Sequence, residues 1–192
     1  QLTNMQVWCQ KVAPSLDVDW ILWTRRPSPQ SPQPSRQYAQ TLRGCQEATR
    51  AQVLVVLPPI STFDVRGSHS YKTEDHFLRR ELGSPRPMVE LTEAFRAAQA
   101  GRGEVLVAKG DHLEVIDQES GKIWLRLDPP RPPPKPGSPI TGPPMDPALY
   151  ALFDEHPEVR EALFFDEGHP DAEGFVLFAK VVGGALIDLW AA

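Results

Sequence analysis

Several features that mark other protein classes are scarce in this sequence of 192 residues. It has only two cysteines, and neither lies in a CxxC or metal-binding spacing. Acidic residues outnumber basic ones, 25 to 20, and no basic segment is interleaved with aromatic residues, so we expect no nucleic-acid partner. The first residues, Gln1 to Met5, lack an initiator Met, a basic region and an apolar core, so they do not predict a signal peptide. We expect a mature N-terminus or an internal cut there.

A long uncharged apolar run is also missing. The longest apolar stretch, residues 175–192, contains Lys180, Asp188 and a pair of glycines. These interruptions favour a buried amphipathic helix, and we expect no membrane span.

The two cysteines, Cys9 and Cys45, lie in two segments that predict helices. Two half-buried thiols are the simpler interpretation. A disulfide is the alternative, and it would imply an oxidising compartment.

What the sequence does contain is an ordinary globular composition, 41% apolar and 23% charged. Its first hundred residues alternate between short apolar runs and helical segments. Strands are expected at 17–23 and 53–57, both apolar on two faces as in a parallel sheet, and at 104–108. This alternation predicts right-handed βαβ units and an α/β fold. Helices are expected at residues 2–14, 35–50, 74–82 and 86–100, and an exposed proline-rich loop at 27–34.

The alternation of strands and helices ends after residue 110. Residues 113–127 predict a β-hairpin with a Gly-containing turn. Residues 128–147 contain ten prolines, which favour a stiff surface insertion, with a ligand for a proline-recognition module as the alternative. Asp146 is expected to cap a helix at 147–152, and a last helix is expected at 171–189.

The segment before that last helix carries the candidate catalytic residues, Asp166 and His169. A carboxylate beside a histidine can fix the imidazole tautomer and stabilise the imidazolium, which is the supporting half of a nucleophilic triad. Spacing alone also fits loop and helix-capping residues.

The same segment resembles the last sequence block of the SGNH (GDSL-like) hydrolase and acetyltransferase family. That block reads Asp-x-x-His-Pro, then Gly, then a helix with an interior Ala. Here the matching residues are Asp166, His169, Pro170, Gly174 and Ala179. The resemblance implies a three-layer α/β/α sandwich with a mainly parallel sheet, formed by residues 1–192 as one domain. The runs at 53–59 and 105–108 would be its fourth and fifth strands.

Other blocks of that family are absent from this chain. There is no Gly-Asp-Ser and no Gly-x-Ser-x-Gly. The Ser and Gly blocks would precede residue 1, so we expect the domain to lack its first strands. No Asn stands near Thr24–Pro27, where the family has one; Arg25 or Arg26 could bind an anion there, or simply be solvated.

The remaining candidates are less specific. Ser61, Ser68 and Ser70 follow a strand but lie in no tight elbow, so each is a poor nucleophile candidate. Asp75-His76 and Asp111-His112 are interpreted as loop residues, and His69 is isolated. Asp154-Glu155-His156 could join the Asp166 segment in a metal cluster, although a charged surface loop is the simpler interpretation.

The sequence therefore leads to two hypotheses. In the first, the chain is an SGNH-like esterase or acetyltransferase domain, inactive as this chain alone, with an ester substrate, His169 as base and Asp166 as its orienting residue. In the second, it is a catalytically degenerate SGNH-fold subunit of a larger assembly. Either way, we expect another segment or subunit to cover the strand near residues 18–23. The compartment stays open, with a slight preference for an extracytoplasmic one, and no cofactor is expected.

Overall fold

The computed structural model describes residues 2–16, 19–24, 32–63, 72–83, 88–128, 146–166 and 168–191. The chain divides into two compact units, each described by itself. Unit 1 comprises residues 1–58, 70–90 and 189–192, and unit 2 comprises residues 59–69 and 91–188.

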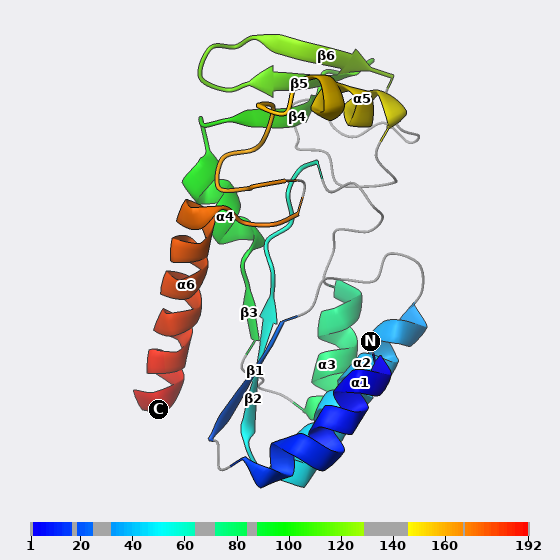
Figure 1. Cartoon of the computed structure of the whole chain (residues 1–192), viewed down its shortest axis with the longest axis vertical. Helices are drawn as coiled ribbons and strands as arrows, with labels where there is room; N and C mark the ends of the chain where they lie inside the picture. Colours follow the sequence, from blue (N-terminus) through cyan, green and yellow to red (C-terminus); the bar gives the residue numbers. More distant parts are fainter. Residues whose placement is uncertain are drawn as a thin grey trace. The chain divides into compact units, whose positions relative to one another are not determined.

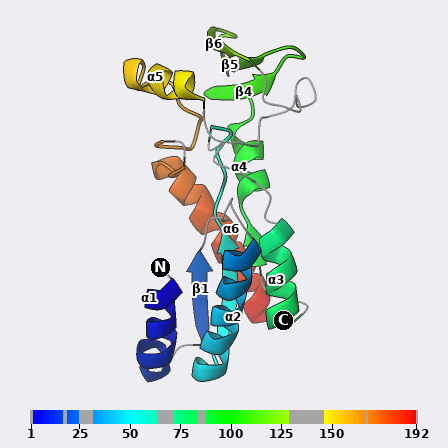
Figure 2. The same ribbon diagram turned by 90° about the vertical axis from the view of Figure 1, so that its right-hand side faces the viewer.

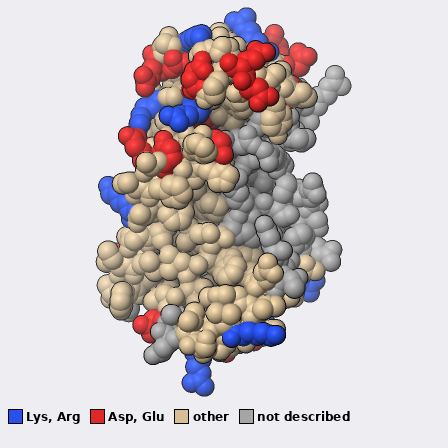
Figure 3. Space-filling model, viewed as in Figure 1, with Lys and Arg blue, Asp and Glu red and all other residues tan. Residues whose placement is uncertain are grey.

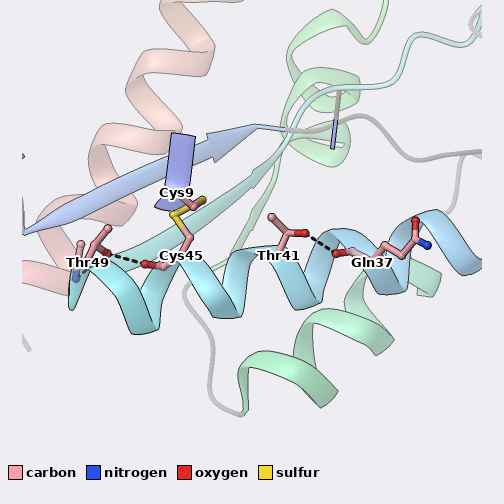
Figure 4. The surroundings of a disulfide bond; sticks show 6 residues. Cys9, Gln37, Thr41, Cys45 and Thr49 are labelled. Atoms are coloured by element: carbon pink, nitrogen blue, oxygen red, sulfur yellow. Dashed lines mark hydrogen bonds between the residues drawn. A yellow bond between two sulfur atoms is a disulfide. The ribbon is translucent and has the colours of Figure 1, made fainter. Parts of the chain in front are cut away.

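Unit 1 begins with two helical segments joined by a disulfide. Helix α1 (Leu2–Val7) continues through a π-helical turn (Trp8–Val12) and a 3-10 turn (Ala13–Ser15), and lies beside α2 (Pro32–Thr49) (Figure 2). Cys9 and Cys45 are both buried and bonded to each other, with a Cα–Cα distance of 4.7 Å (Figure 4). The two cysteines are therefore a disulfide and not a pair of thiols.

A three-stranded parallel sheet forms the rest of unit 1. Its order is β1 (Trp20–Thr24), β2 (Gln52–Leu57) and β3 (Met88–Glu90), as Figure 1 shows. β2 is the central strand and is buried from Val53 to Leu57, which its continuous apolar run predicts. Helix α3 (Lys72–Leu82) packs against α2.

Strand β1 is an edge of this sheet among the described residues, because it pairs with β2 alone. Its run is apolar on both faces, and the two faces differ in burial within the described residues. Ile21 is buried, whereas Leu22 is 46% exposed. Trp23 packs edge-to-face on Trp8, with 6.1 Å between ring centroids, which leaves the Leu22 side without a described cover.

Two other expectations in unit 1 need correction. The segment 86–100 was expected to be one helix, but Met88–Glu90 forms β3 and the helix starts at Thr92. Pairing with β2 overrides helix propensity there, as tertiary contacts often do. The proline-rich stretch 27–34 was expected to be loop throughout, yet α2 includes Pro32 and Pro34 in its first turn, where proline is tolerated. Residues 25–31 lie outside the described residues.

Unit 2 contains helix α4 (Thr92–Gln99) and a three-stranded antiparallel sheet. The sheet has the order β4 (Glu104–Ala108), β5 (Leu113–Asp117) and β6 (Ile123–Leu127). The hairpin is thus confirmed, but β4 is not a parallel strand. Only four residues separate β4 from β5, and Lys109 N–H bonds the His112 carbonyl at 2.8 Å across this turn. Parallel neighbours need a crossover of about a dozen residues or more, so a turn this short requires antiparallel pairing.

Helix α5 (Pro147–Glu155) lies beside this antiparallel sheet (Figures 1 and 2). Asp146 caps it as expected, since its carboxylate accepts the Ala148 N–H at 2.8 Å. The core of unit 2 joins the sheet to this helix and to Phe63. Its buried members are Phe63, Leu106, Ala108, Leu113, Val115, Leu127, Leu149, Leu152 and Val159. The insertion at 129–145 lies outside the described residues.

Helix α6 (Ala172–Ala191) was expected to be buried, and it is largely exposed. Gly174 and Val182 are buried, whereas Phe175, Val176 and Ile187 are 58%, 70% and 69% exposed. In the described part of the chain, it is the one helix long and apolar enough to cross a membrane, by length and composition alone. Lys180 and Asp188 lie within it, and no membrane span is inferred from it.

The architecture is therefore mixed α/β with two small sheets, of which one is parallel. On the face drawn in Figure 3, acidic and basic side chains are intermingled over the antiparallel sheet of unit 2. Among the residues drawn in colour on that face, no continuous basic patch is seen.

Candidate functional site

Asp166 and His169 lie on a short closed loop that leads into α6, in the orange segment of Figure 1. Phe165 N–H donates to the His169 carbonyl at 2.7 Å, and Asp171 N–H donates to the Leu163 carbonyl at 2.9 Å. These two backbone bonds hold both ends of the loop. They hold the backbone from which the Asp166 and His169 side chains project.

The glycine of the family-like block is required by close packing. Gly174 lies in the first turn of α6, whose start is capped by the Asp171 carboxylate at 2.8 Å. A Cβ at Gly174 would overlap the Leu163 carbonyl oxygen and would lie 2.8 Å from the Pro170 Cβ. Leu163 itself has a φ of 68°, an uncommon backbone conformation for a bulky residue. The helix and the loop that carries Asp166 and His169 therefore approach very closely.

The Asp166 carboxylate is bonded to the loop and to the imidazole at once. Its Oδ1 accepts the backbone N–H groups of Gly168 and His169, both at 2.8 Å. Both carboxylate oxygens lie 2.8 Å from His169 Nδ1. The predicted adjacency of the two side chains is confirmed. A proton on Nδ1 is held by this contact, which leaves the lone pair of Nε2 available for proton transfer.

The loop also keeps Asp166 ionised. Burial acts to raise the pKa of this carboxyl, but hydrogen bonds from the Gly168 N–H, the His169 ring and the His169 N–H outweigh it, so the pKa is lowered. The His169 side chain is 71% exposed and that of Asp166 is 43% exposed. The pair is thus open to solvent.

No nucleophilic serine is seen at the pair among the serine side chains that the structure describes. Ser15 donates to the Val12 carbonyl at 2.7 Å, and Ser120 donates to Asp117 at 2.5 Å. Ser61 is 2% exposed, and its Oγ accepts the Phe63 N–H at 3.0 Å. Ser68 and Ser70 lie outside the described residues, as do Arg25 and Arg26.

A buried carboxylate close to the pair was missed by sequence reasoning. Glu161 is 2% exposed, and both of its oxygens accept the Thr62 N–H at 2.8 Å. Burial raises its pKa from 4.5 to about 7, against hydrogen bonds from Thr62 and Ser61 and the charge of Arg96. No sequence signal marks it, because Glu158-Val159-Arg160-Glu161 has the composition of a charged surface loop.

A cavity of about 190 Å³ lies next to Asp166 within unit 2. Its lining is mainly apolar and aromatic, with three charged side chains. The residues are Phe63, Phe153, Pro157, Val159, Arg160, Glu161, Phe165 and Asp166.

His112 turned out to be more than a loop residue. Its Nδ1 lies 2.6 Å from Asp111 and its Nε2 lies 2.9 Å from the buried carboxylate of Glu114, which Arg126 also contacts at 3.0 Å. The hydrogen bond to Glu114 first, and that to Asp111 next, raise the pKa of His112. Both ring nitrogens are thus occupied, so this histidine has no lone pair for general-base work.

The other histidines have structural contacts. His156 lies 3.1 Å from Glu158 and its ring packs on Trp124, with 5.0 Å between centroids. His76 packs against Phe77, and His69 lies outside the described residues. Within the described ranges, no group of three or more His, Cys, Asp or Glu side chains could hold a metal ion, so the cluster considered around Asp154 and His156 is not formed there.

Comparison with protein-family models, with curated proteins and with solved structures finds no match to this chain. The geometry of the Asp166–His169 pair is therefore the observation on which a function can be based.

Proposed function

We propose that this chain is an SGNH-like domain in which Asp166 and His169 support acyl transfer or ester hydrolysis. The observation that carries the proposal is the 2.8 Å contact between the Asp166 carboxylate and His169 Nδ1, with the imidazole largely exposed. In the reaction, His169 Nε2 takes the proton of a serine hydroxyl as that oxygen attacks the ester carbonyl. The same nitrogen then returns the proton to the departing alcohol, while Asp166 holds the ring and balances its positive charge.

The parallel sheet β1–β3 with α2 and α3 is compatible with a three-layer α/β/α sandwich that lacks its first strands, and we include this fold in the proposal. The Cys9–Cys45 disulfide supports an extracytoplasmic compartment, because disulfides persist under oxidising conditions.

The competing proposal is a catalytically degenerate subunit that keeps the fold for assembly. It is favoured by the absence of a Gly-x-Ser-x-Gly motif and by the open edge at β1. In this alternative the Asp166–His169 contact only closes the loop before α6.

Labelling with a fluorophosphonate separates the two proposals, because this reagent reacts with a serine only when a base activates it. The protein is labelled in the cells that produce it, as wild type and as His169→Gln, and mass spectrometry locates the modified serine. A labelled serine that disappears in His169→Gln supports the enzyme. No label, or a label that His169→Gln leaves intact, supports the degenerate subunit. We expect the isolated 192-residue chain to remain unlabelled and to show no turnover of short acyl esters.

A further inference from the structure

The cavity beside Asp166 has the lining of a site for an apolar group. Five of the residues that line it are apolar, and three of these are phenylalanines from separate parts of unit 2. Phe63 and Phe153 pack edge-to-face with 5.2 Å between their centroids, and they form one side. Phe63 belongs to the buried core, so this side is rigid.

Phe165 supplies the third aromatic wall and is 69% exposed. Its backbone N–H is bonded to the His169 carbonyl at 2.7 Å, so its ring is carried by the same loop that holds the Asp166–His169 pair. An aromatic ring that is open to solvent and attached to a held backbone beside a hollow can cover a bound apolar group.

The charged residues of the lining favour a neutral occupant. Both oxygens of Glu161 are bonded to the Thr62 N–H, and Asp166 is bonded to Gly168 and His169. Both carboxylates are therefore already engaged by donors of the protein itself. Arg160 is the one cationic side chain in the lining, and the apolar residues offer no side-chain donor for an anion.

The size of the hollow restricts the group further. Cavities of about 150 Å³ with aliphatic and aromatic walls take up benzene. A hollow of about 190 Å³ therefore accommodates one phenyl ring or a compact alkyl group of similar size. His169 does not line it, so the group that binds here is a substituent a few bonds from the reacting carbonyl.

We propose that this cavity is a subsite for the phenyl or compact alkyl substituent of a neutral ester whose carbonyl is presented to His169. This inference rests on the proposed acyl-transfer function for its catalytic meaning. The binding itself requires only the cavity and Phe165.

The test measures binding of two neutral amides that resist hydrolysis, N-phenethylacetamide and N-ethylacetamide, to the full chain by NMR titration. We expect the phenethyl compound to bind at least about tenfold more tightly, the lower end of the effect of burying one aromatic group. Phe165→Ala should weaken phenethyl binding by roughly fivefold, as expected for one aromatic contact, and leave the ethyl compound unaffected. Phe175→Ala is the matched control, because Phe175 is 58% exposed on α6 and does not line the cavity.

Equal affinities of the two amides, or an equal loss in Phe175→Ala and Phe165→Ala, would overturn the subsite. Phe153→Leu is a second variant, checked for folding by circular dichroism, and it should also weaken the phenethyl compound. Tight phenethyl binding in a protein without a fluorophosphonate-reactive serine would leave the subsite standing and remove the proposed reaction. A reactive serine without phenethyl preference would do the reverse.

Discussion

At the scale of single residues, the start of α6 depends on the absence of a side chain at position 174. Gly174 is buried against the Leu163 carbonyl and Pro170, whereas nothing lies within 4 Å of a Cβ placed at Gly183. Gly174→Ala should therefore reduce the free energy of unfolding by about 1–3 kcal/mol, the usual effect of overpacking. Gly183→Ala should instead raise it by about 0.5–1 kcal/mol, because alanine favours a helix interior. Urea unfolding of both variants measures the difference, and equal effects would contradict the argument that Gly174 is required by close packing.

Glu161 gives a second prediction at this scale, a pH dependence of stability. Burial raises the pKa of Glu161 from 4.5 to about 7, so the folded protein keeps a proton that the unfolded chain releases in this window. Stability should therefore fall as pH rises from 4.5 to 7. Glu161→Gln removes this loss. The free energy of unfolding of this variant, relative to that of the wild type, should therefore rise by about 3 kcal/mol between pH 4.5 and 7.

The control for that prediction is Glu158→Gln. Glu158 is exposed, and its pKa is lowered by its own backbone N–H and by His156. This variant should keep the wild-type decline in stability between pH 4.5 and 7. A decline that persists unchanged in Glu161→Gln would assign the effect to another group.

These residues also show how much of the site the sequence could reveal. Asp166, His169 and Gly174 were predictable because they are close in sequence, and their geometry follows from one loop. Glu161 and Phe63 were not, because they meet only after residues 59–63 and 161–166 pack together, and that packing leaves no mark in a single sequence.

At the scale of elements, strands and helices were predicted well where local pattern decides. The run 53–57 and the hairpin 113–127 were found as expected. The errors lie where the pairing with another strand determines the structure: Met88–Glu90 pairs with β2, and Glu104–Ala108 pairs with β5. The antiparallel pairing of β4 with β5 could have been predicted from the sequence, because the four-residue turn between them is too short for a parallel crossover.

Strand β1 carries the element-scale prediction. Its outer edge is unpaired among the described residues, and Trp20 and Trp23 are half-buried beside the exposed Leu22. Such an apolar edge favours association with another chain or segment. Leu22→Lys should weaken self-association, or binding of the native partner, by about an order of magnitude in sedimentation or pull-down measurements.

Val7→Lys is the matched control, because Val7 is 45% exposed in the same unit but lies on α1. It should leave association unchanged. A wild-type chain that stays monomeric at every concentration and captures no partner would contradict the expected cover over β1.

At the scale of the whole molecule, the two compact units predict two kinds of unfolding behaviour. Both cysteines lie in unit 1, so the Cys9–Cys45 disulfide closes a loop with a sequence separation of 36 residues inside that unit alone. The loss of chain entropy in the unfolded state corresponds to about 4 kcal/mol for a loop of this length. Reduction, or the double change Cys9→Ala with Cys45→Ala, should therefore destabilise unit 1 by about that amount. Unit 2 contains no cysteine and has its own core around Phe63, Leu106 and Leu149.

Hydrogen exchange followed by peptide mass spectrometry tests this prediction, because it reports each unit separately. With the disulfide reduced, peptides covering α1, α2 and β2 should lose protection by two orders of magnitude or more, since each 1.4 kcal/mol corresponds to about a tenfold change in the opening equilibrium. Peptides covering β4, β5 and α5 should exchange at unchanged rates. Equal loss of protection in both sets would mean that the chain unfolds as one cooperative body, and unchanged protection in α1 and α2 would mean that the disulfide has no part in holding unit 1 together.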